Sequence, residues 1–267
     1  PVDFGVWQAD DGTWQLWSCI RKTACGGNTR LFHRWEGANL TDTDWTPMGI
    51  AMEAKPEYGE SVGGLQAPHV IPYDGGYRMF YGDWVHICMA RSEGGKTFER
   101  IVRDDGTTGM FGEGPDANAR DPMVIRVGDL WHCYYTAHPN RTGSVYCRTS
   151  KNLLDWSESK RVAYGGRAGK QFWSAECPHV VQIGDWFYLF RTQRYGENMK
   201  TNVYRSKDPL YFGIDDDSYW VCSLPVAAPE IIRHDGQYYI ASLKGALDGI
   251  KIAKLEWVAA GGESTKE

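Results

Sequence analysis

The sequence predicts an all-β fold, a five-bladed β-propeller of four-stranded antiparallel blades around a central axis. Two observations carry this prediction. The first is composition, because 12 Trp, 15 Tyr and 9 Phe accompany 31 Gly and 12 Pro in 267 residues. That combination is typical of many short strands joined by tight turns. The second is a repeated segment, since self-similarity at a regular spacing marks repeat architectures such as propellers.

Four segments share a Pro, an apolar run, a Gly/Asp turn and an aromatic strand. In each, the Pro precedes the first aromatic of the second strand by nine residues, as Pro68 precedes Tyr77. The segments are QAPHVIPYDGGYRMFY from Gln66, RDPMVIRVGDLWHCYY from Arg120, ECPHVVQIGDWFYLF from Glu176 and AAPEIIRHDGQYYIA from Ala227. The N-terminal segment DFGVWQADDGTWQLW fits the same frame, with Gly5 in the Pro position and Trp14 as the aromatic. The sequence therefore contains five repeats.

Each repeat continues with a third strand and a Trp- or Phe-bearing fourth strand. These segments are LFHRWEGANLTDTDW, ICMARSEGGKTF, VYCRTSKNLLDW, VYRSKDPLYF and IKIAKLEW. One blade cannot bury both of its faces, so five blades stacked radially form a single closed domain. We expect this domain over residues 1–258 and a solvated, flexible tail over 259–267. The sequence begins at Pro1 without an initiator Met, which predicts that a leader was removed or the chain trimmed.

Charge and cysteine content limit the function classes. A formal net charge of −5 argues against nucleic-acid binding, and no apolar run is long enough for a transmembrane helix. We expect no nucleic-acid or membrane partner, and a monomer. Seven cysteines without a CxxC pair argue against a zinc ribbon and a fully paired disulfide scaffold. Cys133 and Cys147 could pair across adjacent strands or remain buried thiols. The compartment stays open, with a secreted or periplasmic location favoured over a cytoplasmic one.

The positions just before the Pro of each repeat are expected to converge on one face, where the first strands of all blades begin. They are Asp3, Gln66 and Ala67, Arg120 and Asp121, Glu176 and Cys177, and Ala227 and Ala228. Carboxylates gathered at an axis repel one another and lose hydration, which has little structural purpose. Glycosidic bond cleavage, however, needs carboxyl groups of different pKa. The positions of Asp3, Asp121 and Glu176 therefore indicate a site that cleaves glycosides.

Two tripeptides on the third and fourth repeats, Arg-Asp-Pro at 120–122 and Glu-Cys-Pro at 176–178, resemble the invertase-type glycoside hydrolases of family 32. Asp3 fits this resemblance as well. In that family the nucleophilic Asp precedes the first aromatic of the second strand by eleven residues, and Asp3 precedes Trp14 by eleven. The resemblance implies Asp3 as nucleophile, Asp121 as the carboxylate that holds sugar hydroxyls, Glu176 as acid/base, and retention at the anomeric carbon. The related families 43 and 62 use the same three positions, with the first Asp as a base acting through water.

Further candidates for sugar contacts lie at the Pro positions, at the ends of the second strands and among the tryptophans. They are Arg120, Gln66, Asp83, Trp84, His138, Arg191, Gln193 and Lys244. Trp7, Trp84 and Trp173 could stack on a sugar ring, although most tryptophans must pack within the blades.

Each of these residues could instead have a purely structural role. Arg120 and Asp121 could form an ordinary salt bridge, and Glu176 could cap a turn. We expect Arg120 to pair with Asp121, which would leave Glu176 as the least compensated carboxyl, with a raised pKa. His69 and His179 follow the Pro at equivalent places, but without the spacing of a metal site. We therefore expect no metal and no cofactor.

The leading interpretation is an exo-acting glycoside hydrolase that removes a terminal sugar from an oligo- or polysaccharide, because a pocket closed at the axis admits a chain end. The resemblance suggests a furanosidic, fructosyl- or arabinosyl-like sugar. Two alternatives stay open. A phosphorylase or transferase on this fold would use basic phosphate ligands, for which Arg120, Arg191, Arg194 and Lys244 are available. A non-catalytic carbohydrate-binding propeller would not need three carboxyl groups at the axis.

Overall fold

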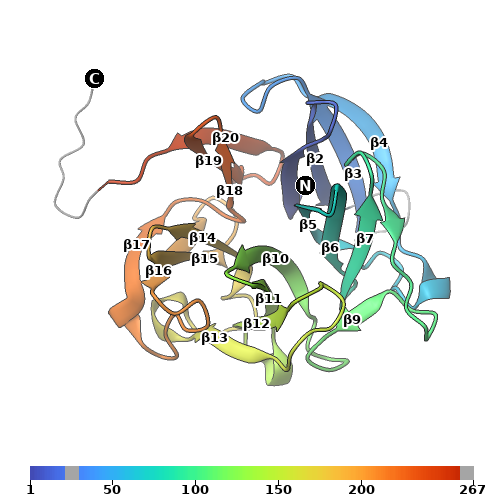
Figure 1. Ribbon diagram of the computed structural model, residues 1–267. Helices are drawn as coiled ribbons and strands as arrows, with labels where there is room; N and C mark the ends of the chain where they lie inside the picture. The colour runs from blue at the N-terminus through green and yellow to red at the C-terminus, as the bar shows by residue number, and fades with distance from the viewer. Residues whose placement is uncertain (22–29, 259–267) are drawn as a thin grey trace.

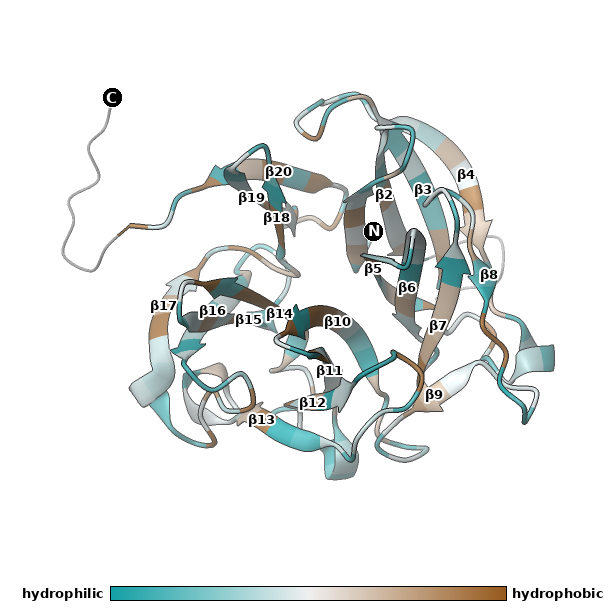
Figure 2. Cartoon of the chain, in the orientation of Figure 1, coloured by the Kyte–Doolittle hydropathy of each residue, from teal (hydrophilic) through white to brown (hydrophobic). Residues whose placement is uncertain are grey.

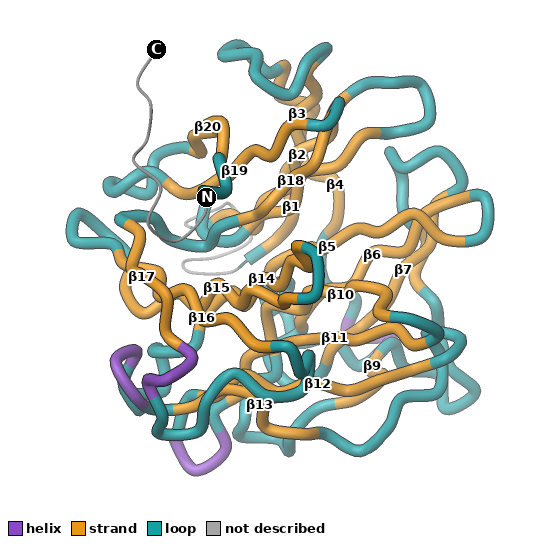
Figure 3. The backbone as a smooth tube through the Cα atoms, turned by 60° about the vertical axis from the view of Figure 1, so that its left-hand side comes forward, coloured by secondary structure: helices purple, strands orange, loops and turns teal. Residues whose placement is uncertain are grey.

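The computed structural model describes residues 1–21 and 30–258, which form five antiparallel sheets around one axis (Figure 1). The prediction of an all-β five-bladed propeller is confirmed. The expected tail at 259–267 lies outside the described residues. Strands make up about half of the described backbone, and the helical segments are single short turns (Figure 3). No helix in the described ranges is long and apolar enough to cross a membrane.

Each sheet runs in chain order from the axis to the periphery. The first holds β1 (Phe4–Gln8), β2 (Trp14–Ile20), β3 (Leu31–Gly37) and β4 (Thr46–Met52), and the second β5 (Gln66–Tyr73), β6 (Gly76–Gly82), β7 (Ile87–Ser92), β8 (Glu99–Arg100) and β9 (Gly109–Phe111). The third holds β10 (Arg120–Val127), β11 (Leu130–Ala137), β12 (Ser144–Ser150) and β13 (Lys160–Tyr164). The fourth holds β14 (Glu176–Ile183), β15 (Trp186–Arg194), β16 (Lys200–Ser206) and β17 (Trp220–Leu224), and the fifth β18 (Glu230–His234), β19 (Gln237–Leu243) and β20 (Ile250–Leu255). The 3-10 turns are η1 (Pro56–Tyr58), η2 (Pro139–Arg141), η3 (Gly166–Ala168) and η4 (Asp217–Tyr219).

Two-residue turns fix the register of the inner hairpins. Asp74 and Gly75 both have positive φ, and so do Asp235 and Gly236, as a type I′ turn requires. In the third and fourth blades only the first turn residue, Gly128 or Gly184, has positive φ, which is 58° in both. Such short turns allow only one strand register in each hairpin. The constant spacing from Pro to aromatic in the sequence therefore corresponds to a constant strand register in the structure.

A β-bulge precedes the Pro of the second, third and fourth blades. The register shifts between Gln66 and His69, and at the equivalent places in β10 and β14. The residues directly before Pro adopt positive φ: Ala67 at 45°, Asp121 at 55°, Cys177 at 43° and Ala228 at 48°. This conformation is uncommon for residues with a side chain. A bulge re-aims side chains, so two consecutive residues of one strand can both serve the axial site.

The outer strands depart from the expected four per blade. The fifth sheet has three strands in the described residues, and in the second blade both β8 and β9 pair with β7. The expected aromatics also lie before the fourth strands and not within them, as Trp45 precedes β4. Phe212 shows the reason, because it is fully buried in the core between the third and fourth blades. The aromatic anchors the chain before it reaches the edge of the sheet.

Apolar clusters fill the spaces between neighbouring blades, and Figure 2 shows hydrophobic stretches along β10 and β14. Successive residues of an inner strand serve different clusters, as Met79 packs with the first blade and Phe80 with the third. The same alternation separates Cys133 from Cys147, which belong to clusters on opposite sides of the third blade. Both are free thiols, so the disulfide alternative is wrong.

Candidate active site

Asp3 lies at the axis, directly before β1, and its carboxylate is surrounded by donors. Oδ1 accepts hydrogen bonds from the Tyr195 hydroxyl at 3.1 Å and the Cys177 thiol at 3.3 Å. Oδ2 accepts from the Cys19 thiol at 3.6 Å, and Arg30 Nη1 lies 3.9 Å from it. Both oxygens therefore act as acceptors, with partners from the first and fourth blades. These contacts fix the direction of the carboxylate.

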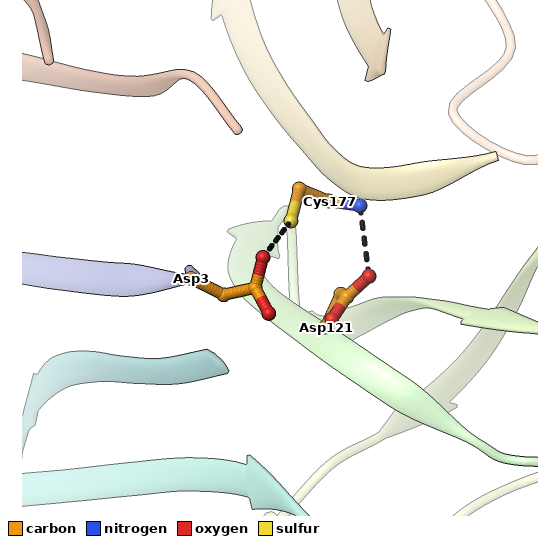
Figure 4. Close-up of side chains that lie close together, drawn as sticks. All are labelled: Asp3, Asp121 and Cys177. Carbon is orange, nitrogen blue, oxygen red and sulfur yellow. Dashed lines mark hydrogen bonds between the residues drawn. The ribbon is translucent and has the colours of Figure 1, made fainter. Parts of the chain in front are cut away.

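Asp121 sits at the bulge of β10 and is 3% exposed. Its Oδ2 accepts the backbone N–H of Cys177 at 2.9 Å, whereas Oδ1 has no hydrogen-bond partner among the described residues. One carboxylate oxygen of Asp3, one of Asp121 and the Sγ atom of Cys177 all lie within 4.8 Å of one another (Figure 4). Burial raises the pKa of Asp121 well above its usual range, and the negative charges of Asp3 and Glu176 raise it further.

Arg120 forms the expected ion pair with Asp121, but it pairs more closely with Glu176, which was not expected. Its Nη2 donates to Glu176 Oε1 and its Nε to Oε2 at 3.1 Å, a bidentate contact, while Nε lies 3.8 Å from Asp121 Oδ2. The bulge is the physical reason that Asp121 is the more distant partner of Arg120, because it directs Asp121 to Asp3 and the Cys177 amide. Asp121 is thus the least compensated carboxyl of the three.

The guanidinium of Arg120 is itself held in place. Its Nη1 donates to the carbonyl of Asn118 and to Nδ1 of His138, both at 3.0 Å, and its Nη2 donates to the carbonyl of Phe172 at 3.2 Å. Burial alone would lower the pKa of Arg120, but the charge of Glu176 raises it. Burial and the charge of Arg120 lower the pKa of His138, so the ring is neutral and Nδ1 can accept.

Cys177 and Tyr195 act as proton donors to Asp3. Burial raises the pKa of both groups well above their usual values, and the charge of Asp3 raises each pKa further. Both side chains are therefore protonated at neutral pH. The Cys177 thiol is consequently a hydrogen-bond donor and not a nucleophile.

Glu230 is a fourth carboxyl group near the axis, which sequence reasoning missed. It lines a small cavity together with Asp3, Asp121 and Cys177. His179 Nδ1 lies 3.4 Å from Glu230 Oε2, and His69 Nδ1 lies 3.9 Å from it. The backbone N–H of Ile231 donates to His179 Nε2, so the proton of a neutral His179 is on Nδ1, facing Glu230. The equivalent positions of the two histidines are explained by this shared carboxyl.

The structure places three expected sugar contacts away from the axial pocket. Trp7 is 6% exposed, packs against Trp17, and donates its indole N–H to Gly95. Asp83 is 2% exposed and accepts the backbone N–H groups of the two residues after Trp84, as a turn cap. Arg191 is 1% exposed and donates only to carbonyls of one loop. These side chains follow the expected strand register, but neighbouring loops and blades cover them.

The remaining candidates differ in exposure and in partners. Gln66 is fully buried, and neither of its amide atoms has a partner among the described residues. Trp84 is half-buried beneath Arg30, whose guanidinium lies 4.9 Å from the ring centroid. Gln193 accepts a hydrogen bond from a side chain of β16. Lys244 is exposed beside a groove between the fifth and first blades. Trp173 is half-exposed.

Arg30 and Tyr195 touch Asp3 but were absent from the sequence-based candidates. Tyr195 had a signal, because it continues the alternation of Arg191 and Gln193 at the end of the second strand. Arg30 had none, since it lies outside the repeated segments. Its position depends on an isolated bridge to Gly64, a contact between blades.

We expect the Asp121→Asn variant to be more thermally stable than the wild type, with a gain that grows with pH. A raised pKa means that the folded state binds the proton more tightly than the unfolded state. The associated stability is complete below the usual pKa of 3.8 and is lost as the pH rises through the folded-state pKa. Asn removes the charge and keeps an acceptor for the Cys177 amide.

Calorimetry between pH 3 and pH 8 measures this difference. A tenfold difference in proton affinity between the folded and unfolded states corresponds to about 1.4 kcal/mol, and each kcal/mol to about 2–4 °C in a domain of this size. Asp116→Asn, which changes an exposed carboxyl of the preceding segment, is the matched control. A Tm difference for Asp121→Asn that is absent, or constant across this pH range, contradicts the assignment.

Arg191→Met is expected to destabilise the fold. The guanidinium donates to the carbonyls of Gly165, Gly169 and Ser174, and burial lowers its pKa to about 10. Met leaves these carbonyls without that donor, at a cost of about 1–3 kcal/mol for each buried unsatisfied group. Urea unfolding measures the loss. The surface variant Arg205→Met should unfold like the wild type, and equal midpoints for all three proteins would refute the prediction.

The sequence matches one family model. The family model described as the Glycosyl hydrolases family 32 N-terminal domain matches residues 32–240. This range contains Asp121 and Glu176, whereas Asp3 precedes it. Among curated proteins, none matches this sequence.

Several solved structures share the fold at low sequence identity. The family 32 β-fructofuranosidase of Bombyx mori is 17% identical with a TM-score of 0.68, over 90% of this chain and 53% of its own. An exo-1,5-α-L-arabinanase from a bovine ruminal metagenomic library is 18% identical with a TM-score of 0.70, over 98% and 95%. An α-L-arabinofuranosidase from Clostridium thermocellum is 13% identical with a TM-score of 0.69, over 97% and 91%.

The present chain spans about half the length of the Bombyx mori enzyme. The family 32 model, in contrast, covers most of the chain and includes both tripeptides that carry Asp121 and Glu176. The expected resemblance is confirmed, and the chain belongs to glycoside hydrolase family 32.

Proposed function

We propose that this chain is an exo-acting glycoside hydrolase that removes a terminal furanosidic sugar, fructosyl- or arabinosyl-like, from an oligo- or polysaccharide. The observation that carries the proposal is the arrangement of carboxyl groups at the axis. Asp3 accepts hydrogen bonds on both oxygens, Asp121 lies beside it with one oxygen unpartnered, and Glu176 shares Arg120 with Asp121. The similar structures described above are named as enzymes of fructosides and arabinosides, and both sugar classes are furanosidic.

The proposed roles follow from these contacts. Asp3, oriented by Tyr195 and Cys177, attacks the anomeric carbon. Glu176 donates a proton to the departing oxygen and then takes one from water. Asp121 binds sugar hydroxyls through its unpartnered oxygen, and its raised pKa lets it donate as well as accept.

Arg120 constrains how Glu176 can act as the acid. A guanidinium has donors only, and in this structure it donates one hydrogen bond to each oxygen of Glu176. Each oxygen has a second lone-pair site, and the transferred proton is carried there, on the side of Glu176 that does not face Arg120. The neutral His138 and the Phe172 carbonyl, which both accept from Arg120, hold the guanidinium in place beside Glu176.

The exo mode is supported by the small size of the cavity at the axis. Asp3, Asp121 and Glu230 line it with Ala67 and Ala228, and two histidines lie against Glu230. A cavity of this size leaves no passage along the axis for a polysaccharide chain, which favours binding at a chain end.

A hydrolysis screen with the wild type and Asp3→Asn tests the function. Sucrose, 1-kestose and inulin represent fructosides, and arabino-oligosaccharides with debranched arabinan represent arabinosides, with products resolved by anion-exchange chromatography. We expect the wild type to release a monosaccharide from one class, and the variant to release none. Release that requires inorganic phosphate would replace hydrolysis with phosphorolysis. Binding without any release would identify a carbohydrate-binding propeller instead.

A further inference from the structure

Phe172 and Trp173 are the most exposed of the Trp, Tyr and Phe rings of this chain, whose 12 Trp, 15 Tyr and 9 Phe all lie in the described ranges. Phe172 is 36% exposed and Trp173 is 50% exposed. The two rings touch edge to face, with centroids 4.5 Å apart and planes at 84°. Every other Trp, Tyr and Phe ring is less exposed than these two, so the adjacent pair is a candidate contact surface.

The loop that carries this pair is firmly held. It runs from η3 to β14, and Arg191 lies beneath it. The guanidinium donates to the carbonyls of Gly169 and Ser174 at 2.9 Å and of Gly165 at 3.3 Å. The Ser174 hydroxyl closes the loop by donating to Gly169 at 2.9 Å. The loop therefore holds the rings in place before a ligand binds, which reduces the conformational entropy lost on binding.

The aromatic pair is coupled to Glu176 through one guanidinium. The carbonyl of Phe172 accepts from Arg120 Nη2, which also donates to Glu176. The Phe172 ring lies against His138, at 5.5 Å between centroids, and His138 accepts from Arg120 Nη1. Another candidate ring, Trp84, lies against Arg30, whose guanidinium is near Asp3.

The position beside Glu176 decides what part of a substrate this surface meets. A general acid lies next to the oxygen of the leaving group, whereas the nucleophile lies on the other side of the sugar that is transferred. We propose that Phe172 and Trp173 form the leaving-group platform, on which the sugar ring next to the cleaved bond stacks. This inference rests on the proposed function and narrows it to glycosides whose leaving group is itself a sugar.

Substrates that share the transferred sugar but differ in the leaving group test the platform. One is the methyl furanoside, and the other is the oligosaccharide with the same terminal residue, in the fructose or arabinose series that the wild type cleaves. We expect Trp173→Ala to lower kcat/KM on the oligosaccharide by about 10-fold, mainly through KM, and on the methyl furanoside by less than about 2-fold. Trp173→Phe should recover part of the loss.

Trp186→Ala is the matched control, because Trp186 is a partly exposed Trp at the opposite end of the β14–β15 hairpin. It should leave both kcat/KM values unchanged. Equal losses for Trp173→Ala on the two substrates, or no loss on the oligosaccharide, would overturn the platform.

A binding measurement separates this inference from the proposed function. Saturation-transfer NMR of Asp3→Asn with the same oligosaccharides needs no turnover. We expect transfer to the second sugar ring, and its loss when Trp173→Ala is added. Transfer confined to the terminal ring contradicts the platform, even in an enzyme that hydrolyses the substrate. Transfer to the second ring without any wild-type hydrolysis supports the platform and contradicts the hydrolase.

Discussion

The Glu176→Gln variant is expected to cleave a natural sugar–sugar linkage about 10²- to 10⁴-fold more slowly than the wild type, the usual contribution of general acid catalysis. Gln has nearly the same shape and still offers one acceptor to Arg120, but it cannot supply a proton. An activated aryl glycoside has a leaving group that needs little protonation. Its cleavage should therefore suffer much less, provided that breaking the glycosidic bond limits the rate. Values of kcat/KM on both substrates measure the contrast.

Glu113→Gln is the matched control for this variant. Glu113 also pairs with an arginine, since Arg148 Nη2 donates to its Oε1 at 3.0 Å, but the pair lies outside the axial site. The control should keep wild-type activity on both substrates. Equal losses for Glu176→Gln on the natural and activated substrates would mean that Glu176 holds the substrate or the fold and is not the proton donor.

The Asp3→Asn variant is expected to lose activity on both kinds of substrate, by about 10⁴-fold or more, as other hydrolases do when their nucleophile is removed. A good leaving group does not replace a missing nucleophile, so the loss of rate should be as large on the aryl glycoside as on the natural substrate. The Asn amide oxygen can still accept from Tyr195 and Cys177, which preserves the local geometry. Initial rates on both substrates measure the loss.

Asp10→Asn is the control for this variant. Asp10 lies in the turn of the same hairpin and accepts a hydrogen bond from Tyr77 at 3.0 Å, away from the axis. It should retain wild-type rates, and circular dichroism should show native folds for both variants. Substantial residual activity of Asp3→Asn on the aryl glycoside would assign the nucleophile to another residue.

The sequence was sufficient for the architecture because the relevant signals are local. The Pro, the two-residue turn and the aromatic of each repeat set the hairpin register without help from the rest of the chain. Repetition then placed Asp3, Asp121 and Glu176 one or two residues before the Pro position of different blades. The number of outer strands could not be predicted from these local signals. Their pairing depends on how each chain segment packs at the sheet edge, as the three-stranded fifth blade shows in the described part of the chain.

The partners of the site residues were less accessible, because they depend on contacts between blades. Arg120 and Asp121 are neighbours in sequence, yet the bulge turns them to different partners. Arg191 has the strand position of a site residue, but the loop above it covers its side chain. Arg30 reaches Asp3 from a segment with no repeat signal.

Mass spectrometry of the glycosyl-enzyme tests the central claim, that Asp3 is the nucleophile and Glu176 the acid/base at the propeller axis. Glu176→Gln should form the covalent intermediate from an activated aryl furanoside but hydrolyse it slowly, because the base for the attacking water is missing. After acid quenching and trypsin digestion, the peptide that ends at Arg21 should be heavier by one dehydrated sugar residue, with fragmentation placing the sugar on Asp3. Continued turnover with an unmodified peptide, or a sugar on another carboxyl group, would contradict the account.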